Sequence, residues 1–293
     1  MDGLTVTEAV RIITPWEQPS TSDTYQSDRP RAHPGVPRGL QSHSGGNMQL
    51  EGLAQSWDQL GQSDPLWAIL SDPAKKGNRW SLEEFFATGE ASVDQVLRHL
   101  DALEVEVNLE RALDFGCGVG RLTQALARHF NEIDGVDIAP SMVGRAREYN
   151  RFGDRCRYHV NTHDDLRMFD DGTFDFVFTD IVLQHMTSEL MLSYVAEFIR
   201  VLRPGGVGLF DIPPGYENTP RGMIVKFAPA PLLAFYRRRA HGGGVMELHT
   251  IKPKRVLDFL ATRPVRVIEH RPLPADRPAV VRHYQYCIER VDG

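Results

Sequence analysis

Residues 113–121 read LDFGCGVGR, and this stretch decides the fold. An apolar run ends in an acid and leads into a glycine-rich turn. Gly116 and Gly118 lack a Cβ, so the backbone can turn sharply there and a ligand can lie against it. A helix is expected next, because apolar residues recur at helical spacing at Leu122, Ala125, Leu126 and Phe130. A strand, a glycine turn and a helix form the first half of a nucleotide-binding βαβ unit.

A second short strand that ends in an acid follows the turn. Residues 132–138 read EIDGVDI, and Asp137 lies 19 residues after Gly118. This is close to the spacing at which an acid at the end of the second strand binds ribose hydroxyls. A carboxylate suits that role because it can accept hydrogen bonds from both hydroxyls. The alternative is that Asp137 only caps the helix expected to start near Pro140.

The turn departs from the pattern of dinucleotide-binding dehydrogenases. That pattern has a third glycine where this chain has Arg121, and an arginine obstructs the close approach of the helix to a pyrophosphate. Asp114 also places a negative charge near the expected position of the pyrophosphate. A carboxylate suits a cationic ligand better, and S-adenosylmethionine carries an ammonium and a sulfonium centre.

The turn and three later segments resemble the motifs of the class I S-adenosylmethionine-dependent methyltransferases. Residues 114–121 resemble the first motif, and residues 136–142 (VDIAPSM) resemble the ribose-binding motif. Residues 174–180 (FDFVFTD) resemble the fourth-strand motif, and residues 202–210 (LRPGGVGLF) resemble the turn and fifth strand. Four matches in the correct order, over roughly residues 92–212, make a specific signal.

The resemblance implies S-adenosyl-L-methionine as the cofactor, and it implies residues that bind it. Asp180 lies where the backbone of the family meets the methionine part and the methyl group. The acid that usually contacts adenine aligns with Thr162, or with Asp164 if a gap is allowed, and a backbone N–H of His163 or Asp164 is another possible contact. The expected cofactor-binding residues are Asp114, Gly116, Cys117, Gly118, Arg121, Asp137, Ile138, Met142, Thr162, His163, Asp164 and Asp180.

Alternating strands and helices predict an α/β fold with a Rossmann-like doubly wound sheet, mostly parallel with an antiparallel edge strand. Ligands of such sheets bind at the carboxyl ends of the strands. The expected strands lie near 111–115, 132–138, 156–161, 174–180 and 206–212, and the expected helices near 119–130, 141–150 and 188–202. A helix over 251–260 and two strands over 265–269 and 280–288 are expected to complete the antiparallel edge.

The chain divides into a tail, an extension and a cofactor-binding domain. Residues 1–47 are rich in Ser, Pro and Gly and are expected to be a disordered tail, with translation from Met48 as the alternative. Residues 48–91 are expected to form a helical N-terminal extension or lid. Residues 92–293 are the expected methyltransferase domain, with a substrate-side insertion over 213–250. Phe85, Phe86 and Thr88 are candidates to cover the cofactor, and the alternative, favoured for most of the aromatic residues of the extension, is that they only pack it onto the core.

The composition is that of a globular protein, with 41% hydrophobic and 25% charged residues. The net charge of −6 and the lack of a basic, aromatic-interleaved stripe argue against nucleic acid as the substrate. No apolar run approaches the length of a membrane span. Cys117, Cys156 and Cys287 are too few and too scattered for a disulfide framework, so a cytoplasmic location is expected. No Cys/His cluster has metal-ligand spacing, and no metal is expected.

Methyl transfer requires an acceptor lone pair aligned with the S–CH₃ bond in a dry pocket. A base is needed only if the acceptor must lose a proton early, as a hydroxyl must. His185, just past the fourth strand, is the first candidate base, and the alternative is that it ties its loop to the backbone. His249 is the second candidate, and an exposed helix-cap residue is its alternative.

The sequence therefore predicts a methyltransferase that acts on a small-molecule acceptor or biosynthetic intermediate, by O- or N-methylation. The alternatives are a catalytically degenerate homologue that only binds the cofactor and an NAD-dependent oxidoreductase. A homo-oligomer is compatible with the sequence.

Overall fold

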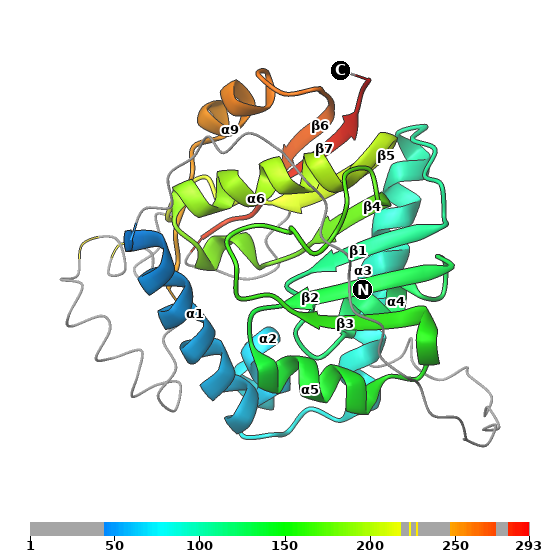
Figure 1. The fold of residues 1–293 in the computed structure, drawn as a ribbon. Coiled ribbons are helices and arrows are strands. Elements are labelled where there is room, and N and C mark those ends of the chain that lie inside the picture. Colours follow the sequence, from blue (N-terminus) through cyan, green and yellow to red (C-terminus); the bar gives the residue numbers. More distant parts are fainter. Residues whose placement is uncertain (1–43, 218–222, 224–226, 228–246, 274–280, 293) are drawn as a thin grey trace, which may run out of the picture. The chain divides into compact units, whose positions relative to one another are not determined.

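Seven strands within the described residues form one sheet in the order β3-β2-β1-β4-β5-β7-β6 (Figure 1). This computed structural model describes residues 44–217, 223, 227, 247–273 and 281–292. The strands are β1 (Arg111–Phe115), β2 (Glu132–Asp137), β3 (Cys156–Val160), β4 (Phe174–Thr179), β5 (Leu202–Asp211), β6 (Val265–Pro272) and β7 (Tyr284–Arg290).

The sheet is mostly parallel. Strands β1 to β5 are paired in parallel, and β7 runs antiparallel to both β5 and β6. The prediction of a mostly parallel sheet with an antiparallel edge is confirmed, and β6 is the outermost strand of that edge. The strand order reverses between β1 and β4. In open sheets of this kind a ligand binds in the crevice at the carboxyl ends of the strands beside such a reversal.

Helices cover both faces of the sheet, because the strands are apolar on both sides. One layer consists of α3 (Leu82–Ala102), α4 (Arg121–Leu126) and α5 (Pro140–Tyr149), and the other of α6 (Ser188–Val201) and α9 (Pro253–Leu260) (Figure 1). Successive side chains of a strand point to opposite faces of the sheet and so pack against opposite helix layers. On β4, Phe176 and Phe178 pack with the first layer and Val177 with the second.

The first helix of this layer is longer than the sequence predicts. Helix α3 runs without interruption across the expected boundary at residues 91–92. Its N-terminus carries a capping box, in which the Ser81 hydroxyl accepts from the backbone of Glu84. Gly89 lies inside the helix, where a Cβ would stand 2.4 Å from the carbonyl oxygen of Arg121. The lack of a side chain therefore lets α3 pack closely on α4.

Two predicted element boundaries are wrong. The helix expected over 119–130 ends at Leu126 and continues as turns, in which the Arg155 guanidinium binds the carbonyl oxygens of Ala127 and Phe130. The strand expected over 206–212 begins at Leu202 and includes an irregular pairing with β4.

The helical extension consists of α1 (Ser44–Ser63), α2 (Pro65–Ile69) and the short helix η2 (Pro73–Lys75). The expected tail lies outside the described residues up to residue 43, and residues 44–47 belong to α1. Most of the expected insertion over 213–250 also lies outside the described residues. The extension buries a separate apolar cluster with the core, made of Leu60, Leu66, Ala68, Phe85, Phe86, Val119, Ala139 and Met142.

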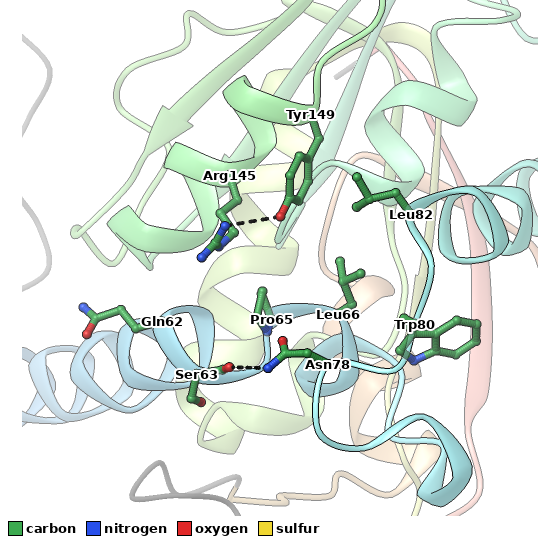
Figure 2. A pocket seen from close by; sticks show the side chains of 9 residues that line it. All are labelled: Gln62, Ser63, Pro65, Leu66, Asn78, Trp80, Leu82, Arg145 and Tyr149. Atoms are coloured by element: carbon green, nitrogen blue, oxygen red, sulfur yellow. Dashed lines mark hydrogen bonds between the residues drawn. The ribbon is translucent and has the colours of Figure 1, made fainter.

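A cavity of about 420 Å³ lies between this extension and α5 (Figure 2). Arg145 and Tyr149 line it from α5, and their side chains share a hydrogen bond of 3.3 Å. On the opposite side Asn78 donates to the carbonyl oxygen of Ser63 at 3.1 Å. None of the residues lining this cavity is among the expected cofactor-binding residues. Among the helices of the described ranges, none combines the length and the apolar character that a membrane span requires.

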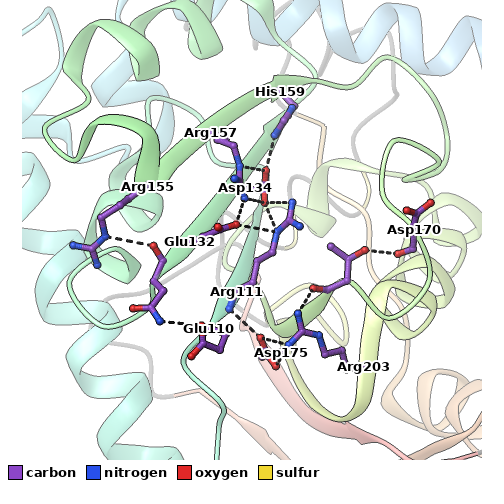
Figure 3. Close-up of polar contacts among 12 residues, drawn as sticks. Glu110, Arg111, Glu132, Asp134, Arg155, Arg157, His159, Asp170, Asp175 and Arg203 are labelled. Carbon is purple, nitrogen blue, oxygen red and sulfur yellow. Dashed lines mark hydrogen bonds and ion pairs between the residues drawn. The ribbon is translucent and has the colours of Figure 1, made fainter. Parts of the chain in front are cut away.

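Asp134 on β2 is a buried carboxylate surrounded by cations of the neighbouring strands (Figure 3). Arg111 Nη2 lies 2.8 Å from Oδ2, and Arg157 Nε and His159 Nε2 lie 3.2 and 2.7 Å from Oδ1. Burial acts to raise the pKa of Asp134, but hydrogen bonds from His159 and Arg157 and the charge of Arg111 lower it to about 2. The carboxylate thus joins β1, β2 and β3 electrostatically.

Replacing Asp134 by Asn should lower the free energy of unfolding by about 2–3 kcal/mol at pH 7. The change removes the buried counter-ion that Arg111 and Arg157 share. The cost stays below that of a fully buried pair because both guanidiniums are partly exposed and keep Glu132 as an exposed partner. Since the folded pKa is lowered, the stabilisation is present above about 4 and is lost as the pH falls to about 2. Urea unfolding at pH 7 and pH 2.5 measures both effects.

The matched control is Glu132→Gln, which removes an exposed partner of the same Arg157 and should cost less than about 1 kcal/mol. Equal losses in the two variants would contradict a dominant role for Asp134.

Candidate functional site

The glycine turn after β1 consists of three glycines in the left-handed backbone region. The φ angles of Gly116, Gly118 and Gly120 are 76°, 54° and 85°. Residues with a side chain rarely adopt such angles, so the glycines are needed for the shape of the turn. The backbone N–H groups of Gly116 and Cys117 both donate to the carbonyl oxygen of Val136 on β2, at 2.7 and 3.0 Å. The turn is therefore fixed at the carboxyl ends of β1 and β2.

Asp137, the expected ribose ligand, holds this turn against the start of α5. Its Oδ2 accepts from the backbone N–H of Gly118, and its Oδ1 accepts from that of Ala139, both at 2.9 Å. Burial raises the pKa of Asp137, and these backbone hydrogen bonds oppose the rise. Each carboxylate oxygen can accept more than one hydrogen bond, so two ribose hydroxyls can still bind. The cap role and the proposed ribose role are compatible in this geometry.

Asp114 lies beneath the turn and contacts a core hydroxyl. Thr123 Oγ1 donates to its Oδ2 at 2.6 Å, and the carboxyl is 1% exposed. Burial raises the pKa of Asp114 to about 7, against the lowering effects of the Thr123 hydrogen bond and the Arg121 charge. Asp114 thus supports the turn from inside rather than facing solvent.

Arg121, which replaces the dehydrogenase glycine, pairs with the acid after β4. Its Nη2 lies 3.3 Å from Asp180 Oδ2, and its Nη1 lies 3.4 Å from the Ser92 hydroxyl on α3. Burial and the nearby charge of Asp211 raise the pKa of Asp180, and Arg121 opposes this rise. The pair connects the two strands on either side of the reversal in strand order.

The loop after β3 presents the expected adenine contacts at the surface. Thr162, His163 and Asp164 are exposed. The buried Asn161, which the sequence analysis did not single out, organises this loop: its Oδ1 accepts from the N–H of His163 at 3.1 Å, and its Nδ2 donates to the carbonyl oxygen of Asp165 at 2.8 Å. The N–H of His163 is therefore engaged within the loop, and the other candidate backbone contact is that of Asp164.

Residues 112–206, which include this turn and the loops after β3 and β4, match the family model described as a methyltransferase domain. The matched region, about a third of the chain, is similar to methyltransferase domains. An uncharacterized methyltransferase of Synechocystis is 34% identical over 98 residues, which are 33% of this chain and 44% of that protein. A ubiquinone biosynthesis O-methyltransferase of Xanthomonas campestris is 33% identical over 97 residues, which are 33% of this chain and 40% of that protein. The chain thus spans less than half the length of these relatives.

Two solved structures share the fold of the methyltransferase domain. Magnesium protoporphyrin IX methyltransferase from Synechocystis, solved with bound SAH, has a TM-score of 0.54 at 17% identity and covers 81% of this chain and 97% of that chain. A SAM-dependent methyltransferase from Leishmania major has a TM-score of 0.56 at 13% identity and covers 81% of this chain and 83% of that chain.

Two apolar side chains rest on the glycine turn of the methyltransferase domain. A Cβ on Gly118 would lie 2.6 Å from Ile69 Cδ1 of α2, and one on Gly116 would lie 2.4 Å from the Val182 methyl groups. Of the candidates to cover the cofactor, Phe85 and Phe86 are buried in the apolar cluster of the extension, which is the packing role given above as the alternative. The covering residue that the sequence analysis missed is Ile69, which no spacing pattern distinguished from the other apolar residues of α2.

The remaining expected cofactor residues are mostly buried. Cys117 is 5% exposed, and burial raises the pKa of its thiol well above the usual value, which makes it a poor nucleophile. Met142 packs in the cluster of the extension, and Ile138 is half-buried. The start of α5 is also tied to α1, because the backbone N–H of Ser141 donates to Asp58 Oδ1 at 2.8 Å.

His185 and His249, the candidate bases, are both bound to neighbouring groups. The Nδ1 of His185 lies 2.7 Å from the carbonyl oxygen of Glu247, and the Trp57 ring packs edge-on at 4.9 Å. Burial lowers the pKa of His185 to about 4, and the backbone hydrogen bond opposes this. His249 Nε2 lies 3.2 Å from the Glu247 carboxylate. His185 therefore joins the loop after β4 to the segment before α9, as does the backbone N–H of His249, which donates to the carbonyl oxygen of Gln184 at 2.7 Å. The base role of each histidine stays a prediction.

Sequence analysis missed a histidine–carboxylate pair at the same edge of the sheet. His283 Nδ1 makes a short hydrogen bond to Asp211 Oδ2, and Asp211 Oδ1 accepts from the N–H of Ile181 at 2.9 Å. Asp211 is the last residue of β5, and an acid at the carboxyl end of a strand is a sequence signal for a site residue. His283 lies inside the strand predicted over 280–288, where a histidine carries no such signal. Within the described ranges, no group of three or more His, Cys, Asp or Glu residues is arranged to hold a metal ion.

Replacing Asp114 by Asn should raise the free energy of unfolding by about 1–3 kcal/mol at pH 8. The amide oxygen can still accept from Thr123, but the side chain no longer ionises. Because the folded pKa is raised to about 7, the stabilisation by the neutral acid is full below about 4 and is lost as the pH rises to about 7. The difference in the free energy of unfolding between Asp114→Asn and wild type should therefore grow as the pH rises from about 4 to about 7. Urea unfolding at pH 4.5 and at pH 8 measures this difference.

The contrasting variant is Asp175→Asn. Asp175 is a buried carboxylate with Arg203 Nη1 at 2.8 Å, so its loss should destabilise the protein at pH 8. An Asp114→Asn protein that is less stable than wild type at pH 8 would refute the raised pKa.

Proposed function

We propose that this chain is an S-adenosylmethionine-dependent methyltransferase that methylates a small-molecule acceptor at oxygen or nitrogen. The observation that carries this proposal is the glycine turn held by Asp137 at the strand-order reversal, inside the segment that matches a methyltransferase domain. Two of the relatives support the class of acceptor, because their names refer to ubiquinone biosynthesis and to magnesium protoporphyrin IX.

The residues at this edge fit the cofactor chemically. Asp137 retains acceptor capacity for the ribose hydroxyls, and the turn at Gly116 and Gly118 has no side chain of its own to obstruct a nucleoside. Asp180 is a partly exposed carboxylate at the end of β4, which favours a cation. When bound, S-adenosylmethionine supplies the activated methyl group. The protein supplies alignment and excludes water.

Binding must displace the cover of the turn. Ile69 stands over Gly118 and Val182 over Gly116, so a ligand that lies on the turn requires both side chains to move. Ile69 ends α2, and its neighbour Leu70 already has extended backbone. The side chain over Gly118 therefore belongs to the last residue of a short helix, next to extended chain.

Replacing Asp137 by Ala should weaken S-adenosylmethionine binding by about 1–3 kcal/mol, or roughly 5- to 150-fold in the dissociation constant. The variant loses both the ribose acceptor and the anchor of Gly118. Isothermal titration calorimetry on the full chain measures the effect. The control is Asp258→Ala on α9, an exposed acid that pairs with Lys254 and should leave the affinity unchanged.

The same titrations separate the alternatives. An oxidoreductase would bind NAD and not S-adenosylmethionine, which would overturn the proposal. Unchanged affinity in Asp137→Ala would contradict the ribose role of this carboxylate. A homologue that only binds the cofactor would bind normally and transfer no methyl group to any acceptor in an extract supplied with labelled cofactor.

A further inference from the structure

We propose that His283 is the base that removes the proton from a hydroxyl acceptor, and that Asp211 orients it. This inference rests on the proposed function and narrows it from oxygen or nitrogen acceptors to hydroxyl compounds.

The hydrogen bonds of the pair fix which nitrogen can act. His283 Nδ1 is bonded to Asp211 Oδ2, and because an ionised carboxylate only accepts, Nδ1 carries the proton. In the neutral ring Nε2 then has the lone pair. Within the described part of the chain no hydrogen bond to His283 Nε2 is found. The side chain of Asp211 is 3% exposed and that of His283 is 24% exposed, so the acid is held inside and the imidazole reaches the surface of the site.

The fold places this pair beside the expected position of the reactive methyl group. Strand β7 is antiparallel, and Asp211 pairs in register with Gln285, so His283 lies at the carboxyl edge of β5. The charge of Asp180, at the end of neighbouring β4, acts on both members of the pair. Asp180 in turn pairs with Arg121 at the end of the glycine turn. The N–H of Ile181, the residue after Asp180, donates to Asp211, so hydrogen bonds and chain neighbours connect the turn to His283.

Backbone strain at the same point indicates a constrained site. Ile181 has a φ of 64°, a left-handed conformation that is unusual for a β-branched residue and costs of order 1–3 kcal/mol. Its N–H donates to Asp211 Oδ1, and its carbonyl oxygen accepts from Gln184 at 3.2 Å. Asp211 therefore holds the strained residue after β4 with one oxygen and His283 with the other. Such strain is concentrated at functional sites.

His283 is a stronger base than His185. The pKa of His283 is raised, because the hydrogen bond that His283 donates to Asp211 and the charges of Asp211 and Asp180 outweigh desolvation. His185 instead has its Nδ1 bound by a backbone carbonyl and a pKa lowered by burial to about 4. His185 also lies close enough for its charge to interact with that of His283, and Arg282, the residue before His283, forms an ion pair with Glu217.

The proton and electron balance of the step is complete. A lone pair of the acceptor oxygen forms the new O–CH₃ bond, and the S–CH₃ bonding pair stays on sulfur, which becomes a thioether. The hydroxyl proton passes to His283 Nε2, and Asp211 stabilises the resulting imidazolium. A carboxylate acceptor would need no base and would be repelled by Asp180 and Asp211. The pair therefore fits a neutral hydroxyl, such as a phenol or catechol.

The test compares wild type with His283→Gln on the full chain, using labelled S-adenosylmethionine and a panel of phenols, catechols, aliphatic alcohols and amines. Glutamine can donate to Asp211 but cannot take up a proton. At pH 7 we expect kcat for hydroxyl probes to fall by about 100- to 10,000-fold. The dissociation constant of S-adenosylmethionine, measured by calorimetry, should be unchanged.

Two further readouts separate a base from a structural residue. The deficit of His283→Gln should narrow as the pH approaches about 10, where a phenol such as p-cresol ionises without help. In histidine NMR titrations of the protein without cofactor, His283 should titrate above 6.5, and Asp211→Asn should lower that value. The matched control is His99→Gln, which breaks a similar pair between His99 and Glu269 at 2.6 Å, with 22% exposure of the histidine, and should leave transfer unchanged.

The outcomes distinguish this inference from the proposed function. If wild type binds S-adenosylmethionine but methylates none of the hydroxyl probes, or only amines, the base role is overturned and the methyltransferase proposal is not. Full activity of His283→Gln on a phenol at pH 7, or a deficit that does not change with pH, also overturns it. If wild type does not bind S-adenosylmethionine, the proposed function itself fails.

Discussion

The structure depends above all on one carboxylate that holds a glycine turn in a left-handed shape. Asp137 accepts a hydrogen bond from Gly118 on one side and from Ala139 on the other. It thereby joins the end of β1 to the start of α5. The turn itself depends on residues without a Cβ, since its φ angles exclude most others. The site at the carboxyl edge is built on this arrangement, and Arg121 extends it to the loop after β4.

The buried acids at the two edges of the sheet differ in their number of cationic partners and in the direction of their pKa shifts. At the amino edge and along β2, Asp134 and Asp175 are saturated by arginines and backbone donors, and the pKa of Asp134 is lowered. At the carboxyl edge, Asp114, Asp137 and Asp180 have fewer cationic partners, and burial raises the pKa of each of them. Carboxylates that are short of cations favour a positively charged ligand. This contrast gives an electrostatic reason for a sulfonium compound at that edge.

The sequence predicts the strand and turn positions well, because they depend on local patterns. The limits of β1 follow from an apolar run, and those of the turn from Gly116, Gly118 and Gly120. Features that depend on contacts between distant residues could not be predicted. Ile69 covers the turn from 49 positions upstream of Gly118, and His283 meets Asp211 across 72 positions. A histidine within a strand pattern carries no signal until its partner is known.

The early end of α4 was not predictable for the same reason. The periodic apolar pattern continues to Phe130, but the regular helix ends at Leu126, and Arg155, from the segment before β3, binds the carbonyl oxygens of Ala127 and Phe130 in the turns that follow. Asn161 likewise has an ordinary loop composition around it, and its organising role comes from its burial.

The side chain of Ile69 over the glycine turn affects the thermodynamics of every ligand that uses this turn. If the turn binds the cofactor as proposed, only molecules in which Ile69 has moved off the turn can bind, so each observed dissociation constant equals the intrinsic one divided by the fraction of such molecules. The same binding-competent fraction enters the dissociation constants of the methyl donor and of its demethylated product. Changes in the packing of α2 therefore shift both affinities in parallel and leave the ratio between them, and with it the degree of product inhibition, unaltered.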